Sequence, residues 1–456
     1  GYLTGITGPV AGATTTFSYD GYGRVRTVTD SEGYTVTTDY DLADRVTRVT
    51  YPDGTSEETA YDKLDAAEFR DRLGRWIRTV HDALRRVVSI RDPQGRTITQ
   101  QWCACGSLDA LVDANGNSTR WERDLQGRVV REGRADGRAT VYAYEGTTSR
   151  LKSVTDPKRQ VTTYGYDLAE ALTALTYTNA EHPTPNVTFT YDAAYGRLVT
   201  MGDGTGTTTY AYHAIGALGQ PGAGQLASVD GPLPNDTLTY TYDALGWVTT
   251  RAIDGVGVTW AYDALGRTTR EENVLGSFTY GYVGTTERLA AVAYPNGQTT
   301  SYSYYGNPGD QRLQTIHHRR PGGATLSKFD YTYETVGNIL TWQQQADADP
   351  PIVWTYRYDL ADQLVAATKQ TTGATPEVLQ RFVYAYDPAG NRTVEQIDDV
   401  PTLSIYNNVN ELVSQVPGGA MLVEGLLDEP ATVTIAGRPA VVTPDTRFRG
   451  VAPVTS

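Results

Sequence analysis

The sequence predicts an all-β protein, built as one long antiparallel sheet of repeated hairpins. Two observations predict this class. A short segment in which aromatic residues alternate with small ones recurs along the chain, and each copy ends in a turn signal. In addition, Gly (46) and Tyr (32) are abundant, whereas no stretch carries apolar residues at helical spacing for three turns. Period-two alternation bounded by turn residues is typical of β-strands.

The clearest copies of the unit lie in residues 237–267. In residues 239–242 and again in 259–262, aromatic rings alternate with small side chains, as expected of a strand with two unlike faces. An Asp-Ala-Leu-Gly segment follows each strand at once. Asp at the first position of a β-turn can bond the backbone ahead of it, and Gly at the fourth can adopt a positive φ. The unit is therefore predicted to be strand, turn, strand.

The unit repeats about every 21 residues. Tyr19, Tyr40 and Tyr61 lie 21 residues apart, and Asp follows each of them. Return turns of the form Asp-x-x-Gly recur half a period later, at residues 71–74 and 92–95. Two strands of about six residues and two turns of about four account for this period.

Some turns lack the glycine. At Asp44, Asp65 and Asp362 an aspartate replaces it, and we expect these residues to adopt the left-handed conformation, which Asp tolerates better than most residues.

The residues expected to define the repeat are its aromatic, acidic and glycine positions. They are Tyr19, Asp20, Gly23, Tyr40, Asp41, Tyr61, Asp62, Tyr166, Asp167, Tyr191, Asp192, Tyr242, Asp243, Gly246, Tyr262, Asp263, Gly266, Tyr358, Asp359, Tyr386, Asp387 and Gly390.

Aromatic doublets predict two columns of rings on one face of the sheet, from Tyr164/Tyr166 to Tyr384/Tyr386. A flat sheet of about forty strands would extend about 190 Å and expose a large apolar face. We therefore expect the sheet to curve into a wall, a tube or part of a shell with the rings inside, where Tyr can pack its ring and keep its hydroxyl in water. The alternative is an outward face whose rings bind sugars or peptides.

The charge balance argues against nucleic acid as a partner. The net charge is −14 and the pI is near 4.9, whereas phosphate binding needs clustered Lys and Arg. No apolar run approaches the roughly 18 residues of a membrane helix. The chain begins in mid-pattern, which is expected of an excised fragment.

The carboxylates and the two cysteines are the obvious candidates for chemistry. Asp recurs where a turn needs it, so turn formation is favoured over acid–base catalysis. Cys103 and Cys105 are too close in sequence to cross-link an unstrained strand, and they leave the redox compartment open. Because Cys103 occupies the turn-Asp position, a plain or redox-sensitive turn is favoured over a pair of metal ligands.

Other candidates give incomplete motifs. His317-His318 is expected to be a solvated loop rather than a ligand pair. Residues 113–117 and Asp347/Asp349 only partly resemble calcium sites. Residues 202–206 lack the Lys-Ser/Thr of a phosphate-binding loop. The sequence nominates no catalytic residue, no metal ligand and no cofactor site, so the chain is expected not to be an enzyme.

The repeat pattern divides the chain into an array, residues 1–412, and a tail, residues 413–456. The tail contains a predicted hairpin about Ala436-Gly437. It resembles the opening strands of immunoglobulin-like modules, or it is a cap on the array.

Tyr-Asp-x-x-Gly-Arg repeats at about 21 residues, with a return turn half a period later, resemble the YD repeats of the Rhs family. YD repeats also build the shells of Tc toxin B and C components and the C-terminal region of teneurins. The resemblance covers residues 14–412 and depends on many copies in phase. It implies a spiralling sheet that often closes into a hollow shell around a toxic C-terminal polypeptide; in teneurins the related shell supports adhesion.

The function implied by this resemblance is a scaffold of a secreted or cell-surface protein that encloses or displays an attached polypeptide such as a toxin. The alternative is an adhesion module that binds glycan or a cell-surface protein. Asp387-Pro388-Ala389-Gly390 has the letters of the family's autoproteolytic ending. It follows Tyr386 in ordinary repeat phase, so it is expected to be another turn.

Overall fold

The computed structural model describes residues 1–216, 219, 221–442 and 446–453. Residues 443–445 and 454–456 of the predicted tail lie outside these. The predicted all-β class is confirmed, because 37 strands form one antiparallel sheet and the short 3-10 helix η1 (Asn307–Gly309) is the one helix among the described residues. None of the described residues form a helix long and apolar enough to cross a membrane.

The strands of the large sheet are mostly five to nine residues long. Those of the first half are β1 (Gly5–Thr7), β2 (Thr14–Tyr19), β3 (Val25–Thr29), β4 (Thr35–Tyr40), β5 (Val46–Thr50), β6 (Ser56–Asp62), β7 (Asp65–Arg70), β8 (Trp76–His81), β9 (Val87–Arg91), β10 (Thr97–Trp102), β11 (Leu108–Val112), β12 (Ser118–Arg123), β13 (Val129–Gly133), β14 (Ala139–Tyr144), β15 (Leu151–Thr155), β16 (Val161–Tyr166), β17 (Leu172–Thr178), β18 (Val187–Tyr191) and β19 (Leu198–Asp203).

The remaining strands of this sheet continue the same succession. They are β20 (Gly206–Tyr212), β21 (Leu226–Asp230), β22 (Leu238–Tyr242), β23 (Val248–Ile253), β24 (Val256–Tyr262), β25 (Thr268–Asn273), β26 (Gly276–Tyr282), β27 (Leu289–Ala293), β28 (Thr299–Tyr304), β29 (Leu313–Arg319), β30 (Thr325–Tyr333), β31 (Ile339–Ala346), β32 (Ile352–Tyr358), β33 (Leu364–Thr371), β34 (Val378–Tyr386), β35 (Arg392–Ile397), β36 (Val400–Tyr406) and β37 (Leu412–Pro417).

Each strand that ends in the repeat tyrosine pairs antiparallel with the next strand through a bulge. In the first such hairpin Ser18 lies opposite Thr27, but Tyr19 lies opposite Val25, so one residue of the return strand is extra. The same shift occurs at Tyr40, and at Tyr262. The turn sequence therefore sets the strand register, as is usual in hairpins.

The register gives the sheet two different faces. Phe17 lies opposite Val28, and Tyr19 is on the same face, which we call the tyrosine face. Thr16 lies opposite Thr29 on the other face, the threonine face. Thr and Ser hydroxyls bond across the strands there, for example Ser18 to Thr27 at 2.6 Å. The alternation follows from the period of two in a strand.

The sheet has little conventional core. The buried apolar residues are mostly small or β-branched, such as Ala110, Ala252 and Val292, and the largest fully buried side chain among the described residues is Thr300. Strand pairing and the contacts at the turns, rather than a thick apolar layer, must therefore hold neighbouring hairpins together.

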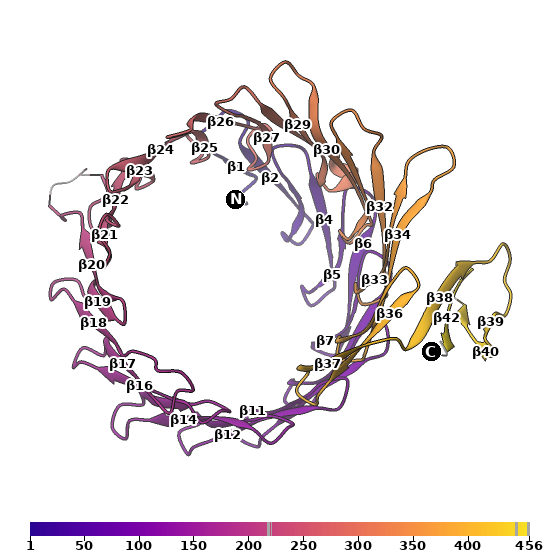
Figure 1. Cartoon of the computed structure of the whole chain (residues 1–456), viewed down its shortest axis with the longest axis horizontal. Coiled ribbons are helices and arrows are strands. Elements are labelled where there is room, and N and C mark those ends of the chain that lie inside the picture. The colour runs from indigo at the N-terminus through magenta and orange to yellow at the C-terminus, as the bar shows by residue number, and fades with distance from the viewer. Residues whose placement is uncertain (217–218, 220, 443–445, 454–456) are drawn as a thin grey trace. The chain divides into compact units, whose positions relative to one another are not determined.

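Two compact units divide the chain. Unit 1 comprises residues 1–5, 15–119 and 301–456, and unit 2 comprises residues 6–14 and 120–300. Unit 2 is an uninterrupted run of hairpins apart from its short N-terminal segment. In unit 1, hairpins of the first stretch lie beside hairpins of the last stretch, as Figure 1 shows for β4–β7 and β32–β36.

The tail forms two small sheets. One comprises β38 (Ala420–Leu426), β41 (Val441–Val442) and β42 (Arg447–Pro453), and the other comprises β39 (Thr434–Ile435) and β40 (Arg438–Pro439). The hairpin expected about Ala436-Gly437 forms, with Ile435 opposite Arg438. The division of the chain at residue 412 stays a prediction, because β37 spans that position and still pairs with β36.

Candidate functional site

The aspartate of each repeat organises its turn. In the first hairpin, Asp20 Oδ1 accepts hydrogen bonds from the backbone amides of Tyr22 (2.9 Å) and Arg24 (3.0 Å). The other carboxylate oxygen, Asp20 Oδ2, pairs with the Arg24 guanidinium at 2.7 Å. Gly23 closes the turn with a φ of 83°. We call this aspartate–arginine arrangement the turn clamp.

The structure places most of the predicted aspartates in such turns. Both the second and the fourth amide after the aspartate donate to it at Asp41, Asp167, Asp243, Asp263 and Asp359. The arginine partner is present at Asp41 and Asp263. Trp247 and Gln363 replace the arginine at Asp243 and Asp359.

The turn clamp holds the carboxylate in its charged form. The Arg45 guanidinium and the Arg45 backbone amide both donate to Asp41, and they lower the pKa of that carboxyl. Arg86 does the same for Asp82. These carboxylates are acceptors with their hydrogen bonds already made, so the arrangement suits a structural role better than proton transfer.

Several turn arginines also reach the following repeat. The Arg24 guanidinium lies over the ring of Tyr40, 4.8 Å from its centroid, and Nη1 donates to the carbonyl oxygen of Asp41 at 2.7 Å. Arg150 likewise lies over Tyr166 and donates to the Asp167 carbonyl. Cation–π contact and a charge-assisted hydrogen bond thus join these turns to the next.

The tyrosine hydroxyl makes the reciprocal contact to the preceding repeat. Tyr40 donates to the carbonyl oxygen of Val25 at 2.9 Å, and Tyr262 donates to that of Val248 at 2.7 Å. The same bond occurs at Tyr19, Tyr61, Tyr166, Tyr191, Tyr242, Tyr358 and Tyr386. Burial raises the pKa of Tyr166, Tyr242, Tyr262, Tyr358 and Tyr386, so these phenols remain donors.

Sequence reasoning missed this hydroxyl ladder, although a signal was present. Tyr outnumbers Phe by 32 to 7, which packing of rings alone does not require. Trp102, the only tryptophan in the repeat-tyrosine position among the described hairpins, supplies an equivalent donor, because its Nε1 bonds the Val87 carbonyl at 2.7 Å. The position selects an aromatic ring with a hydrogen-bond donor at its far end.

Two expectations about turns and loops are wrong, and one turn is shorter than expected. Asp62 ends strand β6 and lies opposite Asp65, so the turn between them contains only Lys63 and Leu64. Lys63, with a φ of 53°, takes the left-handed position expected of Asp65, whereas Asp44 and Asp362 do adopt it. The predicted loop at His317-His318 is part of β29, because His317 lies opposite Lys328 and its ring nitrogen contacts Thr325 at 3.0 Å.

Asp192 and Asp387 vary the turn. Asp192 begins a turn that is one residue longer, in which Gly196 rather than the fourth residue takes the positive φ. At Asp387 the partner is Asn391, which donates its backbone amide to Oδ1 and its side-chain amide to Oδ2. Gly390 has a φ of 92°, and its amide bonds the Asp387 carbonyl as in the other turns.

Unit 1 brings together turns that are far apart in the sequence. The Arg72 guanidinium pairs with Asp310 at 2.7 Å and with Asp53 at 2.8 Å, and the hydroxyl of Tyr34 donates to Asp310 at 2.9 Å. The side chains of Arg72 and Asp310 are only 7% and 11% exposed. The group is therefore a largely buried ion pair that links return turns of the first stretch to the turn before β29.

Further contacts join other turns of the same two stretches of unit 1. Arg75 pairs with Asp362 at 2.9 Å, Arg96 Nη1 donates to Gln363, Asn115 donates to Asp387, and Asn410 donates to Asp113. We call the set from Arg72 to Asn410 the turn seam. Return turns of residues 71–117 meet turns of residues 305–411 along it. The repeat pattern gives no sign of which turns meet, so the sequence did not predict the turn seam.

The tail contacts the threonine face of unit 1. The side chain of Gln396, 4% exposed, accepts from the Leu422 amide at 2.7 Å and donates to the Leu422 carbonyl at 3.2 Å. Glu424 pairs with Arg357 of β32 and with Arg449 of β42. Through these contacts the described part of the tail lies on the face of β32 opposite to Tyr356 and Tyr358.

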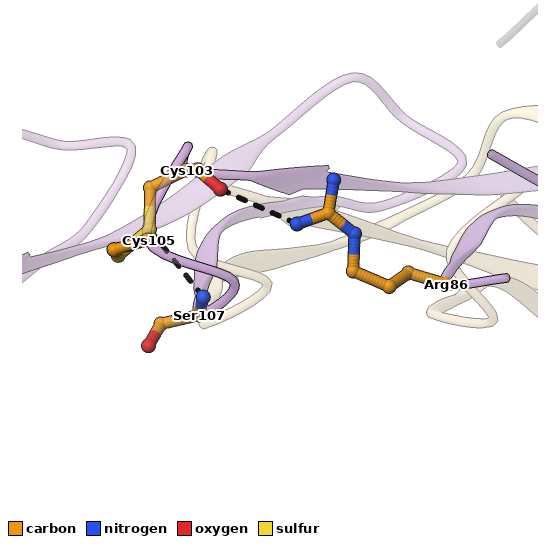
Figure 2. The surroundings of a disulfide bond; sticks show 4 residues. All are labelled: Arg86, Cys103, Cys105 and Ser107. Carbon is orange, nitrogen blue, oxygen red and sulfur yellow. Dashed lines mark hydrogen bonds between the residues drawn. A yellow bond between two sulfur atoms is a disulfide. The ribbon is translucent and has the colours of Figure 1, made fainter. Parts of the chain in front are cut away.

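The two cysteines form a disulfide within a turn rather than across a strand. Cys103 and Cys105 are joined with a Cα–Cα distance of 5.2 Å, directly after β10. Figure 2 shows the Ser107 amide donating to the Cys103 sulfur and the Arg86 guanidinium donating to the Cys103 carbonyl. No group of three or more His, Cys, Asp or Glu residues suited to a metal ion occurs in the part of the chain that the structure describes.

Comparisons with known proteins agree with the repeat pattern. The family model described as RHS Repeat matches residues 1–35, 19–56 and 147–182. The chain is 25% identical over 332 residues to Double-stranded DNA deaminase toxin A of Burkholderia cenocepacia (strain H111), an alignment that covers 71% of this chain and 19% of that toxin.

Two solved structures have a similar fold. The crystal structure of TcdB2-TccC3-TEV aligns with a TM-score of 0.73 and 19% identity, covering 90% of this chain and 24% of that one. A Tc holotoxin pore of Photorhabdus luminescens aligns with a TM-score of 0.70 and 19% identity, covering 88% of this chain and 24% of that one. The chain thus spans about a quarter or less of these relatives.

Proposed function

Because this chain belongs to the YD-repeat family, also called the Rhs-repeat family, we propose that it is a non-catalytic scaffold segment of a larger secreted or surface-displayed protein of toxin type. In this role the sheet encloses or displays an attached polypeptide. The observation that carries the proposal is the likeness to TcdB2-TccC3-TEV, which extends over 90% of this chain but only 24% of the relative. The deaminase in the name of the Burkholderia relative describes that protein.

The tyrosine face supports this proposal. The rings of its repeat tyrosines are held by the hydroxyl ladder, and the described tail contacts the opposite face at β32. Val28, Phe69 and Ile98 of this face remain 37%, 37% and 41% exposed. A half-exposed apolar surface with polar hydroxyls suits weak contact with an incompletely folded polypeptide.

The carboxylates of the turn clamps suit a structural role. The recurring carboxylates of the turn clamps already have their hydrogen-bond partners, and they lie at separate turns rather than converging. A chemical role would need a site where such groups meet around a space for substrate.

Limited proteolysis of the intact gene product tests the proposal. The polypeptide attached to the array should be digested more slowly than the same polypeptide produced alone, and electron microscopy should show density against the tyrosine face. Phe69→Ser should weaken this protection. Leu125→Ser is the matched control, because Leu125 is fully exposed at a turn, and it should leave protection unchanged.

Equal digestion rates with and without the array would overturn the proposal. Retention of the chain on a glycan array, abolished by Phe69→Ser, would instead favour an adhesion module.

A further inference from the structure

The turn at residues 103–107 has the same backbone hydrogen bonds as the corresponding turns of neighbouring repeats, but its side chains are cross-linked differently. The Cys103 amide bonds the Ser107 carbonyl at 3.0 Å and the Gly106 amide bonds the Cys103 carbonyl at 3.1 Å. The corresponding turn of the preceding repeat has the same two bonds, between Asp82 and Arg86 and between Arg85 and Asp82. The fold therefore imposes one turn geometry on both sequences.

The turn clamp is what differs. In the corresponding turn of the preceding repeat the Arg86 guanidinium pairs with Asp82 at 2.6 Å, and in the following repeat Arg128 pairs with Asp124 at 2.6 Å. Cys103 and Ser107 occupy the corresponding positions, and neither can form that ion pair. The disulfide from Cys103 to Cys105 is the cross-link that this turn has instead.

The sulfur of Cys103 stands where the neighbouring turns have a carboxylate oxygen. The Ser107 amide donates to it at 3.4 Å, just as the Arg86 amide donates to Asp82 Oδ1 at 3.0 Å (Figure 2). Such a position stabilises negative charge, because an amide donor and the nearby Arg86 guanidinium both favour an anion. Cys103 is therefore the better leaving thiolate of the pair.

Cys105 is the accessible sulfur. It lies among exposed residues at the tip of the turn, whereas Cys103 is half-buried. Thiol–disulfide exchange needs access to one sulfur and a stable thiolate on the other, and exposed disulfides are the more easily reduced ones. The turn meets both requirements without any need to unfold.

We propose that the Cys103–Cys105 disulfide is a thiol-reactive modification site of the native protein, open to small-molecule thiols, and that it substitutes for the turn clamp of this repeat. In the first step a thiolate RS⁻ attacks the Cys105 sulfur, the S–S bond breaks, and Cys103 leaves as a thiolate. A second RS⁻ attacks the mixed disulfide, which releases RSSR and the Cys105 thiolate. The protein gains two electrons and, on protonation, two protons.

The first experiment measures reactivity in the folded chain. The oxidised 456-residue protein is incubated with increasing reduced glutathione, alkylated and analysed by intact mass, while circular dichroism monitors the sheet. Two alkyl groups should be added at glutathione concentrations that leave the β-sheet spectrum unchanged. Alkylation that appears only when the spectrum is lost would overturn the proposal.

The second experiment tests the substitution for the turn clamp. Hydrogen exchange of peptides covering residues 97–112 should become about tenfold faster after reduction, the size that the chain-entropy treatment gives for so short a disulfide loop. The variant C103D/C105A/S107R rebuilds the Asp–Arg turn clamp, and its exchange should be slow and indifferent to glutathione. C103A/C105A should exchange like the reduced protein.

Exchange in residues 97–112 that is unchanged by reduction would contradict the cross-linking role. The same conclusion would follow if C103D/C105A/S107R exchanged as fast as C103A/C105A. Peptides covering β14 and β15 serve as the internal reference, because their turn lies outside this hairpin.

Discussion

The tyrosine hydroxyl is the residue-scale feature that best explains the composition of the chain. At most repeats it satisfies a carbonyl of the preceding hairpin, which Phe cannot do. A neutral hydrogen bond of this kind contributes about 1 kcal/mol, and its loss leaves an acceptor without its partner.

Tyr262→Phe should remove this bond and keep the ring. We expect the Val248–Tyr262 region to lose about 1 kcal/mol of local stability, which makes its hydrogen exchange about fivefold faster. Tyr22→Phe is the control, because Tyr22 is 76% exposed at a turn, and its exchange should be unchanged. Equal effects of the two substitutions would show that the hydroxyl ladder contributes nothing.

Glycine at the fourth turn position stabilises the turn because it adopts a positive φ without strain. Glu170 takes this position after Asp167 with a φ of 68°, a conformation that costs a residue with a Cβ atom about 1 kcal/mol. Glu170→Gly should therefore raise the denaturant midpoint of the protein. Gly127→Ala should lower it, since Gly127 has a φ of 81° and an added Cβ would meet no neighbouring atom. A midpoint that moves in the same direction for both would refute this reasoning.

At the scale of the element, the hairpin is a strand pair fixed by one charged turn clamp. The sequence predicted the strands and the turns, because alternation and the Asp-x-x-Gly spacing are local properties. It predicted the acidic turn at Asp41 for the same reason. It could not predict that Asp62 would end a strand. Tyr61 lies opposite Ala66, whereas Tyr40 lies opposite Val46, so this connection is one residue shorter although the letters Tyr-Asp are the same.

The turn clamps make the hairpins sensitive to acid. The pKa of Asp41 is lowered by Arg45, so its contribution to stability is complete above the pKa of an unfolded aspartate, about 4, and is lost as the pH falls through the lower folded value. Asp82 and Asp124 act in the same direction. The thermal midpoint, followed by circular dichroism, should fall steeply below about pH 4.

Asp41→Asn provides the control for this pH dependence. Asn keeps an oxygen for the amides of Ala43 and Arg45 but loses the charge that pairs with the Arg45 guanidinium. Hydrogen exchange of the β4–β5 hairpin in this variant should change less between pH 5 and pH 3 than in the wild type, after correction for intrinsic rates. An identical pH response would rule out a role for the ion pair.

At the scale of the whole molecule, the turn seam joins turns that are far apart in sequence, and the repeat pattern does not predict these contacts. Arg72 and Asp310 are 238 residues apart in sequence, and both are largely buried. Nothing in the local pattern distinguishes Arg72 from other arginines at turns, because its partner is set by how the two stretches of unit 1 meet. The turn seam is therefore the part of the site that only the three-dimensional structure supplies.

Breaking the buried ion pair between Arg72 and Asp310 should lower the stability of unit 1. Asp310→Asn removes the negative charge that compensates the Arg72 guanidinium, and the Arg72 side chain is only 7% exposed. We therefore expect the free energy of unfolding of unit 1 to fall by about 3 kcal/mol. Limited proteolysis near residues 301–312 should accelerate accordingly. Glu181→Gln is the matched control, since its pair with Lys158 is exposed and should contribute little to stability. A double-mutant cycle of Arg72→Met and Asp310→Asn measures the coupling directly.

The hydroxyl ladder has a direction that bears on how the chain is made. Each tyrosine of the hydroxyl ladder donates to a strand that was synthesised earlier, as Tyr40 does to Val25, so that its hydroxyl bond needs no strand still to come. A polypeptide that leaves the ribosome N-terminus first can therefore add hairpins one at a time, each newcomer docking on a finished template. Assembly of this kind is vectorial, and it lets a very long ribbon form without a search through the alternative pairings of its many similar strands.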